Sequence, residues 1–191
     1  MKLHTISLKN YRLIDDAEIH LETGVSATVL VGPNNSGKTS VVEAISAFLS
    51  GKVKSFAIND FSVRTHPQFN AFESAALAIA ANEEAAVALP ELPLMRMDLN
   101  FRYEDIADDL NVADLLLMDL DETSSEIKFR IELRPILEDE LAATFKAFRD
   151  KDAKWGLREF LASHLSSYYE VRYYKVAKDG GAQVIASEDA G

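Results

Sequence analysis

Residues 32–39 read Gly-Pro-Asn-Asn-Ser-Gly-Lys-Thr, which is the complete pattern of a phosphate-binding P-loop. Glycine lets the backbone turn tightly, so that successive amide groups can point at phosphate oxygens. Lys38 would contact the outer phosphates as a point charge, and the hydroxyl of Thr39 would hold a magnesium ion. The stretch therefore predicts a site for a nucleoside triphosphate with Mg²⁺. The residues expected to bind the nucleotide are Gly32, Asn34, Asn35, Ser36, Gly37, Lys38, Thr39 and Ser40.

The sequence on both sides of the loop strengthens this prediction. Residues 27–31 read Ala-Thr-Val-Leu-Val, a short apolar run rich in β-branched side chains, which predicts a buried strand. Beyond the loop, Val41, Ile45 and Phe48 fall at helical spacing, as expected for a helix whose N-terminus faces the phosphates. Gly51 is a natural C-cap for this helix. A strand, a glycine-rich loop and a helix in this order favour a P-loop over an accidental turn.

The rest of the chain alternates between strand patterns and helix patterns, which predicts an α/β fold. Asp179, Gly180 and Gly181 supply the turn chemistry of a hairpin between the last two strands. Residues 52–70 show no regular pattern and contain the break at Pro67. Strands are expected at 2–9, 17–22, 94–103, 126–133, 168–177 and 182–186, and further helices at 71–89, 136–149 and 154–167.

Composition limits the class of protein. The chain has 191 residues, enough to bury a real core, and it contains no cysteine, which excludes disulfides and cysteine-based metal sites. No apolar run approaches the roughly 20 residues that span a bilayer, and no secretory signal is visible at the N-terminus. We therefore expect no membrane partner and a cytoplasmic location.

The net charge of −11 is concentrated in the middle of the chain. Residues 71–150 contain 19 acidic and 7 basic side chains, whereas the segments on either side are close to neutral. A nucleic-acid surface needs clustered Lys and Arg, which this acidic segment lacks. We interpret it as a solvated acidic face, with an acidic docking surface as the alternative.

Three features near the N-terminus resemble one known group of proteins. They are the Asn10-Tyr11-Arg12 step after the first strand, the two strands before the loop, and the Gly-Pro-Asn-Asn-Ser-Gly-Lys-Thr-Ser run at 32–40. Together they resemble the N-terminal part of RecF/SMC-type ATPases. Within that group the likeness is greatest to the OLD (overcoming lysogenisation defect) family, many of whose members are ATP-dependent nucleases.

This resemblance implies an N-terminal half of a P-loop ABC-type ATPase head, with an antiparallel β lobe and added helices. It implies ATP and Mg²⁺ as ligands and a head-to-head homodimer that encloses the ATP. A nuclease domain usually follows in such proteins, so DNA would be contacted by parts outside this chain.

The resemblance also implies roles for two further residues. Arg12 would approach the nucleotide phosphates from the end of the first strand, although a plain surface arginine fits the sequence equally well. Asp60 lies where the family places a loop that contacts the magnesium ion or its waters. A helix-capping or turn role for Asp60 is the alternative.

The second half of such a head carries a signature motif and a strand that ends in acidic residues. Residues 49–52 are similar to the start of a signature motif, but they are better explained as the glycine C-cap of the first helix. Residues 115–122 read Leu-Leu-Leu-Met-Asp-Leu-Asp-Glu and imitate the acidic strand. We interpret them as residues with a structural role in the β lobe, because in the family the acidic strand comes after the signature motif.

We therefore interpret residues 1–191 as a single incomplete ATPase domain that binds ATP with little turnover. Its parts are the strands, P-loop and first helix at 1–52, the acidic helical and β-lobe segment at 71–150, and a helix with the terminal hairpin at 151–191. A non-catalytic, nucleotide-gated dimerisation module is an alternative. A different P-loop NTPase or a kinase is another, although the Asn-Lys-x-Asp motif of GTPases is absent from the sequence.

Overall fold

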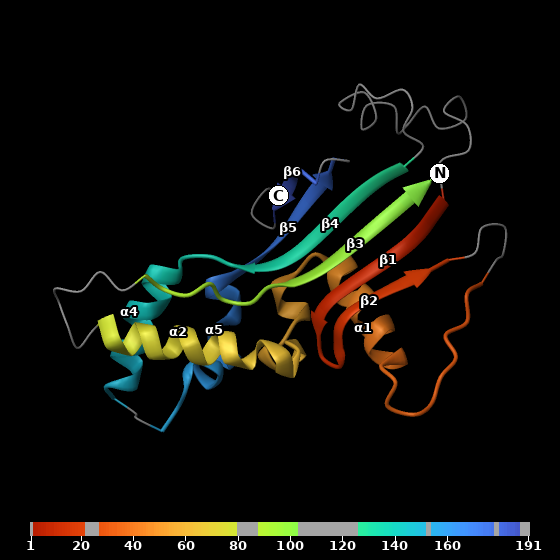
Figure 1. Ribbon diagram of the computed structural model, residues 1–191. Helices are drawn as coiled ribbons and strands as arrows, with labels where there is room; N and C mark the ends of the chain where they lie inside the picture. The colour runs from red at the N-terminus through yellow and green to blue at the C-terminus, as the bar shows by residue number, and fades with distance from the viewer. Residues whose placement is uncertain are drawn as a thin grey trace.

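A computed structural model describes residues 2–21, 27–79, 88–102, 126–151, 154–177 and 180–187. Its strands form one six-stranded sheet in the order β2-β1-β3-β4-β5-β6, and every neighbouring pair is antiparallel. Figure 1 shows this sheet as one twisted layer, with α1 beside β1 and β2 and with α2, α4 and α5 grouped at one end. The α/β prediction with an antiparallel lobe is confirmed.

Most of the expected elements occur where the sequence pattern places them. Two strands precede the P-loop, one helix follows it, and the last two strands form the predicted hairpin. The strands are β1 (Lys2–Tyr11), β2 (Ile14–His20), β3 (Met95–Arg102), β4 (Glu126–Pro135), β5 (Tyr169–Val176) and β6 (Ala182–Ser187). The helices are α1 (Lys38–Ser50), α2 (His66–Ile79), α4 (Glu138–Arg149) and α5 (Leu157–Tyr168), with short 3₁₀ turns η1 (Val53–Ser55), η2 (Ile58–Asp60) and η3 (Val63–Thr65).

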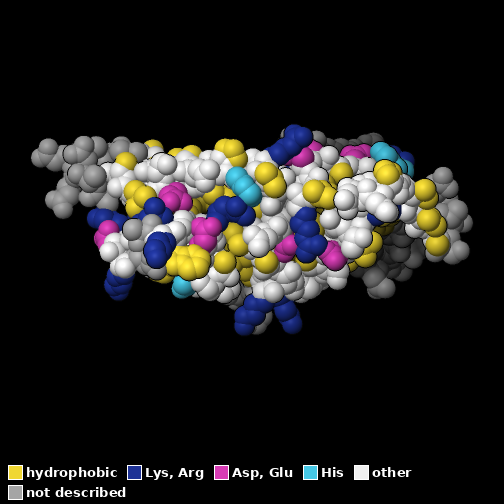
Figure 2. Space-filling view, turned by 90° about the horizontal axis from the view of Figure 1, so that it is seen from below, with side chains coloured by type: hydrophobic (Ala, Val, Ile, Leu, Met, Phe, Trp, Pro, Cys, Tyr) yellow, Lys and Arg dark blue, Asp and Glu magenta, His cyan; other side chains and the backbone are white. Residues whose placement is uncertain are grey.

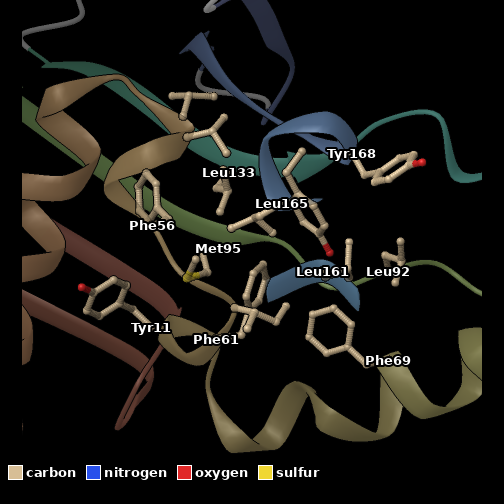
Figure 3. Close-up of a cluster of buried hydrophobic side chains, with 14 of the residues drawn as sticks. Tyr11, Phe56, Phe61, Phe69, Leu92, Met95, Leu133, Leu161, Leu165 and Tyr168 are labelled. Atoms are coloured by element: carbon tan, nitrogen blue, oxygen red, sulfur yellow. The ribbon is translucent and has the colours of Figure 1, made fainter. Parts of the chain in front are cut away.

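The core lies between one face of the sheet and the helices. Alternate strand residues such as Leu8, Met97 and Leu133 are fully buried, as expected for a sheet with one apolar face. Figure 3 shows side chains from the sheet, the helices and the 3₁₀ turns meeting in one apolar cluster. Phe61 anchors the 3₁₀ turns in this core, since its ring lies 5.2 Å from the Phe69 ring and 5.5 Å from the Tyr169 ring.

The sequence predicts an irregular segment at 52–70 and a helix at 71–89. The predicted boundary between them is wrong. Three 3₁₀ turns fill residues 53–65, and α2 already begins at His66. Pro67 therefore lies in the first turn of the helix instead of breaking it. Proline is favoured there, because its missing N–H would have no partner within the helix.

The expected buried strand at 27–31 is not observed, and this prediction is wrong. Residues 27–31 pair with no described strand, and Val29 and Val31 are 77% and 90% exposed. An apolar run becomes a buried strand only when neighbouring strands satisfy its backbone and a layer covers its side chains. In the part of the chain that the structure describes, β1 has β2 and β3 as its neighbours, and no strand lies beside 27–31. The acidic run at 115–122 lies outside the described residues.

The face of the sheet opposite the helices carries charged side chains in cross-strand pairs. Asp98 on β3 is only 2% exposed, and its carboxylate accepts hydrogen bonds from Arg130 (2.8 Å) and pairs with Lys128 (3.0 Å). Burial alone would raise the pKa of this carboxyl. The hydrogen bonds from Arg130 and Lys128 outweigh it and hold the pKa of Asp98 below its usual value. A buried carboxylate with cationic partners ties β3 to β4 on this face.

We predict that Asp98→Asn lowers the free energy of unfolding by about 2–4 kcal/mol at neutral pH, because the cations around a buried carboxylate lose their partner. Since the folded pKa lies below the unfolded value of about 3.9, this contribution is present above pH 4 and is lost as the pH falls through the folded pKa. Urea unfolding at several pH values measures the difference. The matched control is Asp16→Asn, whose side chain is 66% exposed beside Lys9 and should change stability by less than about 1 kcal/mol.

Gly51 is the predicted C-cap of α1, and the structure confirms it. Its φ is 68°, in the left-handed region, and its N–H donates to the Phe48 carbonyl at 3.1 Å. A Cβ at this position would overlap the Tyr173 hydroxyl. Glycine is therefore required for two reasons. The backbone is left-handed at this position, and the end of α1 lies too close to β5 to leave room for a side chain.

We predict that Gly51→Ala destabilises the protein by more than the about 1–2 kcal/mol that a left-handed alanine costs, because the new methyl group also displaces Tyr173. Gly180→Ala is the control, since Gly180 has φ 87° but no atom within 4 Å of a built Cβ. Equal losses in urea unfolding for the two variants would contradict the proposed contact.

Candidate functional site

The P-loop runs directly into the N-terminus of α1. Gly37 is the N-cap residue with φ 86°, and no side chain caps the first turn of the helix. The first amide groups of a helix have no partner within it, so they are available to an anion that approaches from the loop. Gly32 is needed for a different reason, because a Cβ there would lie 2.9 Å from the Ser36 hydroxyl oxygen. The two glycines thus permit the left-handed turn at one position and the close approach at the other.

Lys38 folds back over its own loop. Its ammonium donates to the carbonyl oxygens of Gly32 and Pro33, both at 2.6 Å, and lies 3.3 Å from the Ser36 hydroxyl. This geometry holds the positive charge inside the curve of the loop, next to the open end of α1. The loop itself is exposed to solvent, apart from Gly37, which is buried. The Lys38 ammonium and the uncapped first turn of α1 are suited to bind a polyphosphate.

Thr39 and Ser40 occupy the first turn of α1. Thr39 is exposed, whereas Ser40 is 9% exposed. Among the described residues, no group of three His, Asp or Glu side chains could hold a metal ion. Magnesium binds readily through one or two protein oxygens together with phosphate oxygens and waters, so Thr39 fits as a single protein ligand for a nucleotide-bound Mg²⁺.

Arg12 lies in the tight turn between β1 and β2, with a left-handed φ of 49°. Its backbone N–H donates to the Asp60 carbonyl at 2.6 Å, and its Nε donates to Asp60 Oδ1, also at 2.6 Å. One terminal nitrogen forms an ion pair with Glu43 on α1. The hydrogen bond to Asp60 raises the pKa of Arg12 further above its usual value, so the guanidinium stays charged. Arg12 therefore joins the first turn of the sheet to the P-loop helix.

Asp60 is buried at 6% exposure and has partners for both carboxylate oxygens. Oδ1 accepts the Arg12 hydrogen bond, and Oδ2 accepts the Ala57 backbone N–H at 2.8 Å, which closes the turn η2. This geometry supports the turn role that the sequence left open. A direct contact with Mg²⁺ would have to use the remaining lone pairs of this buried carboxylate.

Glu43 is the residue of this site that sequence reasoning missed. It lies four residues after Thr39 and therefore on the same side of α1, one helical turn from the P-loop. An exposed glutamate in a helix is common on any protein surface, so the sequence alone gave no reason to select it. Its importance depends on the Arg12 side chain, which comes from 31 residues earlier in the chain.

A polar cavity of about 200 Å³ lies away from the P-loop, on the charged face of the sheet. His4, His20, Asn100 and Lys128 contribute to its lining. His20 pairs with Thr5 near the start of β1, whereas the P-loop packs near Ile14 at the other end of the β1–β2 pair. We therefore do not assign this cavity to the nucleotide.

Comparison with known proteins gives one match over almost the whole chain and two kinds of partial match. The family described as AAA ATPase domain matches residues 1–186. The DNA replication and repair protein RecF of Rickettsia massiliae (strain Mtu5) is 46% identical over 50 residues, which is 26% of this chain and 13% of that protein. RecF of Rickettsia conorii is 44% identical over the same share of each protein. The matched part thus spans about one eighth of the length of these relatives.

A solved structure described as "Structural biochemistry of ATP-driven dimerization and DNA stimulated activation of SMC ATPases" is also similar. It shares 16% sequence identity, covers 77% of this chain and 79% of its own, and superimposes with a TM-score of 0.40. Within the described ranges, no helix combines the length and apolar character needed to cross a bilayer. Because the family match extends from residue 1 to residue 186, and because this match agrees with the P-loop at the start of α1, the chain belongs to the AAA ATPase domain family.

Proposed function

We propose that this chain is the Mg-ATP-binding part of a RecF/SMC-type ATPase of the OLD kind, coupled to DNA processing or phage defence. The observation that carries the proposal is the position of Lys38, folded into the P-loop at the uncapped N-terminus of α1. The loop, the ammonium and the helix end together provide the donors that a triphosphate needs. ATP is the expected nucleotide because the family is an ATPase family.

The apolar surface beside the P-loop supports the idea that the ATPase core is completed by other parts of the protein. Val29 and Val31 before the loop are largely exposed, and Val42 and Leu49 on α1 are each 61% exposed. Contiguous apolar side chains of this kind are usually covered in a finished protein. We propose that further parts of the protein cover this surface and bring the carboxylate that activates water. DNA would be bound there or beyond, and two such heads would enclose ATP as a homodimer.

One face of the molecule bears on where DNA could bind. On the face seen from below in Figure 2, basic and acidic side chains lie next to each other, and the basic ones form no continuous patch. DNA binding depends on clustered positive charge that displaces counterions from phosphates. This observation supports the assignment of DNA contacts to parts outside the chain.

Within the ATP site, each residue has a proposed role. Lys38 neutralises the outer phosphates, Thr39 binds Mg²⁺, and the amides of 32–40 hold the phosphate oxygens. Arg12 reaches the phosphates from the β1–β2 turn. Asp60 serves first to hold Arg12, and a contact with Mg²⁺ or its waters would use the remaining lone pairs of its carboxylate. Positioning and charge neutralisation are the parts of phosphoryl-transfer catalysis that these residues supply.

We predict that Lys38→Ala weakens ATP binding by about 10- to 100-fold, because one charge-assisted hydrogen bond to phosphate contributes about 1.5–3 kcal/mol. Titration calorimetry with Mg-ATP measures the change. Lys54→Ala, which removes an exposed lysine from η1, is the matched control and should bind ATP like the parent protein. Selective binding of GTP over ATP would rule out the proposal.

We further predict that this chain alone hydrolyses ATP slowly or not at all, whereas a longer chain of the same protein that includes the second half of the head turns ATP over. The reason is that, as the resemblance implies, the water-activating carboxylate would come from the acidic strand in the second half of the head. Phosphate release measures both rates, with Lys38→Ala in the longer chain as the inactive control. Full turnover by residues 1–191 that is lost in Asp119→Asn or Glu122→Gln would instead place catalysis within this chain.

A further inference from the structure

The Arg12 side chain has two acidic partners that differ strongly in their surroundings. The Asp60 side chain is 9% exposed and is itself fixed by the Ala57 N–H, whereas the Glu43 side chain is 46% exposed. Arg12 is also held at its backbone by the Asp60 carbonyl. The two bonds to Asp60 are therefore the buried anchor of Arg12, while the bond to Glu43 is an exposed ion pair that water or another anion can replace.

The anchor leaves most of the guanidinium available. Only Nε is used for Asp60, and the terminal nitrogens carry four more N–H donors. The guanidinium is planar and rigid, so a rotation that redirects these donors also turns Nε–H away from Asp60, while the backbone N–H of Arg12 still donates to the Asp60 carbonyl. Arg12 can therefore exchange its second partner without any movement of the β1–β2 turn.

The position of Glu43 places this exchange next to the phosphates. Glu43 follows Thr39 by four residues, which corresponds to a rise of about 6 Å along α1. A guanidinium bound to Glu43 thus lies about one helical turn from the P-loop end of the helix. A nucleotide in the loop presents oxygen atoms of the same charge as the Glu43 carboxylate, so the two compete for the same donors.

We propose that Glu43 is a positioning residue that holds Arg12 in the empty site and releases it to the phosphates when ATP binds. Glu43 lowers the apparent affinity for ATP, because the Arg12–Glu43 pair must open before Arg12 can contact the nucleotide. The inference rests on the proposed function, and it adds to the ATP site an acidic residue that competes with the phosphates for Arg12.

The test is the ATP affinity of Glu43→Gln, measured by titration calorimetry in two backgrounds. In the parent protein we expect binding to tighten about two- to fivefold, which corresponds to about 0.4–1 kcal/mol, the upper part of the range for an exposed ion pair. In the Arg12→Ala background the same substitution should change affinity by less than about 1.5-fold, because the competition needs Arg12. Glu140→Gln, the loss of an exposed acid from α4, is the control for charge alone and should leave ATP binding unchanged.

Each other outcome overturns the inference in a distinct way. Weaker binding by Glu43→Gln would show that Glu43 presents Arg12 to the nucleotide instead of competing for it. Equal tightening with and without Arg12 would show simple repulsion between Glu43 and the phosphates. If the parent protein binds ATP and Lys38→Ala does not, either result defeats only the inference about Glu43. If the parent protein does not bind ATP, the proposed function fails and this inference fails with it.

Discussion

The candidate site depends on the attachment of the β1–β2 turn to the 3₁₀ turns that follow α1. Two backbone hydrogen bonds hold these segments together: Arg12 N–H donates to Asp60, and Ser62 N–H donates to Asn10. Together they form the antiparallel bridge between Tyr11 and Phe61. The Phe61 ring is buried between Phe69 and Tyr169, which fixes the attachment to the core. Because the Arg12 side chain starts from this turn, the packing of apolar rings determines where its charge lies.

The two sides of α1, the helix that begins at the P-loop, are buried to different degrees. Ala44, Ala47 and Phe48 are buried against the rest of the protein, and small side chains at two of these positions allow a close approach. Val42 and Leu49 remain exposed, as does the apolar run before the loop. One side of α1 is therefore packed against the domain, whereas part of its other side is apolar and exposed.

The elements that were predicted correctly are those whose pattern is local. Alternating apolar residues specified β1, β3 and β4, and glycine at position 51 specified the end of α1. The two errors have a common cause. Pro67 and the run at 27–31 were each assigned from local preference, whereas a proline is accepted in a first helical turn and a strand needs neighbours that pair with it. Residue identity alone does not specify these neighbours.

By itself, the sequence determined the chemistry of the site: a P-loop with its lysine, its threonine and the glycines that the loop geometry requires. It also determined the α/β class, because periodicity is a property of consecutive residues. Only the tertiary structure decided which charges meet. Arg12 is 31 residues from Glu43 and 48 residues from Asp60, and no local pattern links positions so far apart. Their meeting results from the burial of the sheet and the aromatic core, which bring the first turn, the P-loop helix and the following 3₁₀ turns to one place.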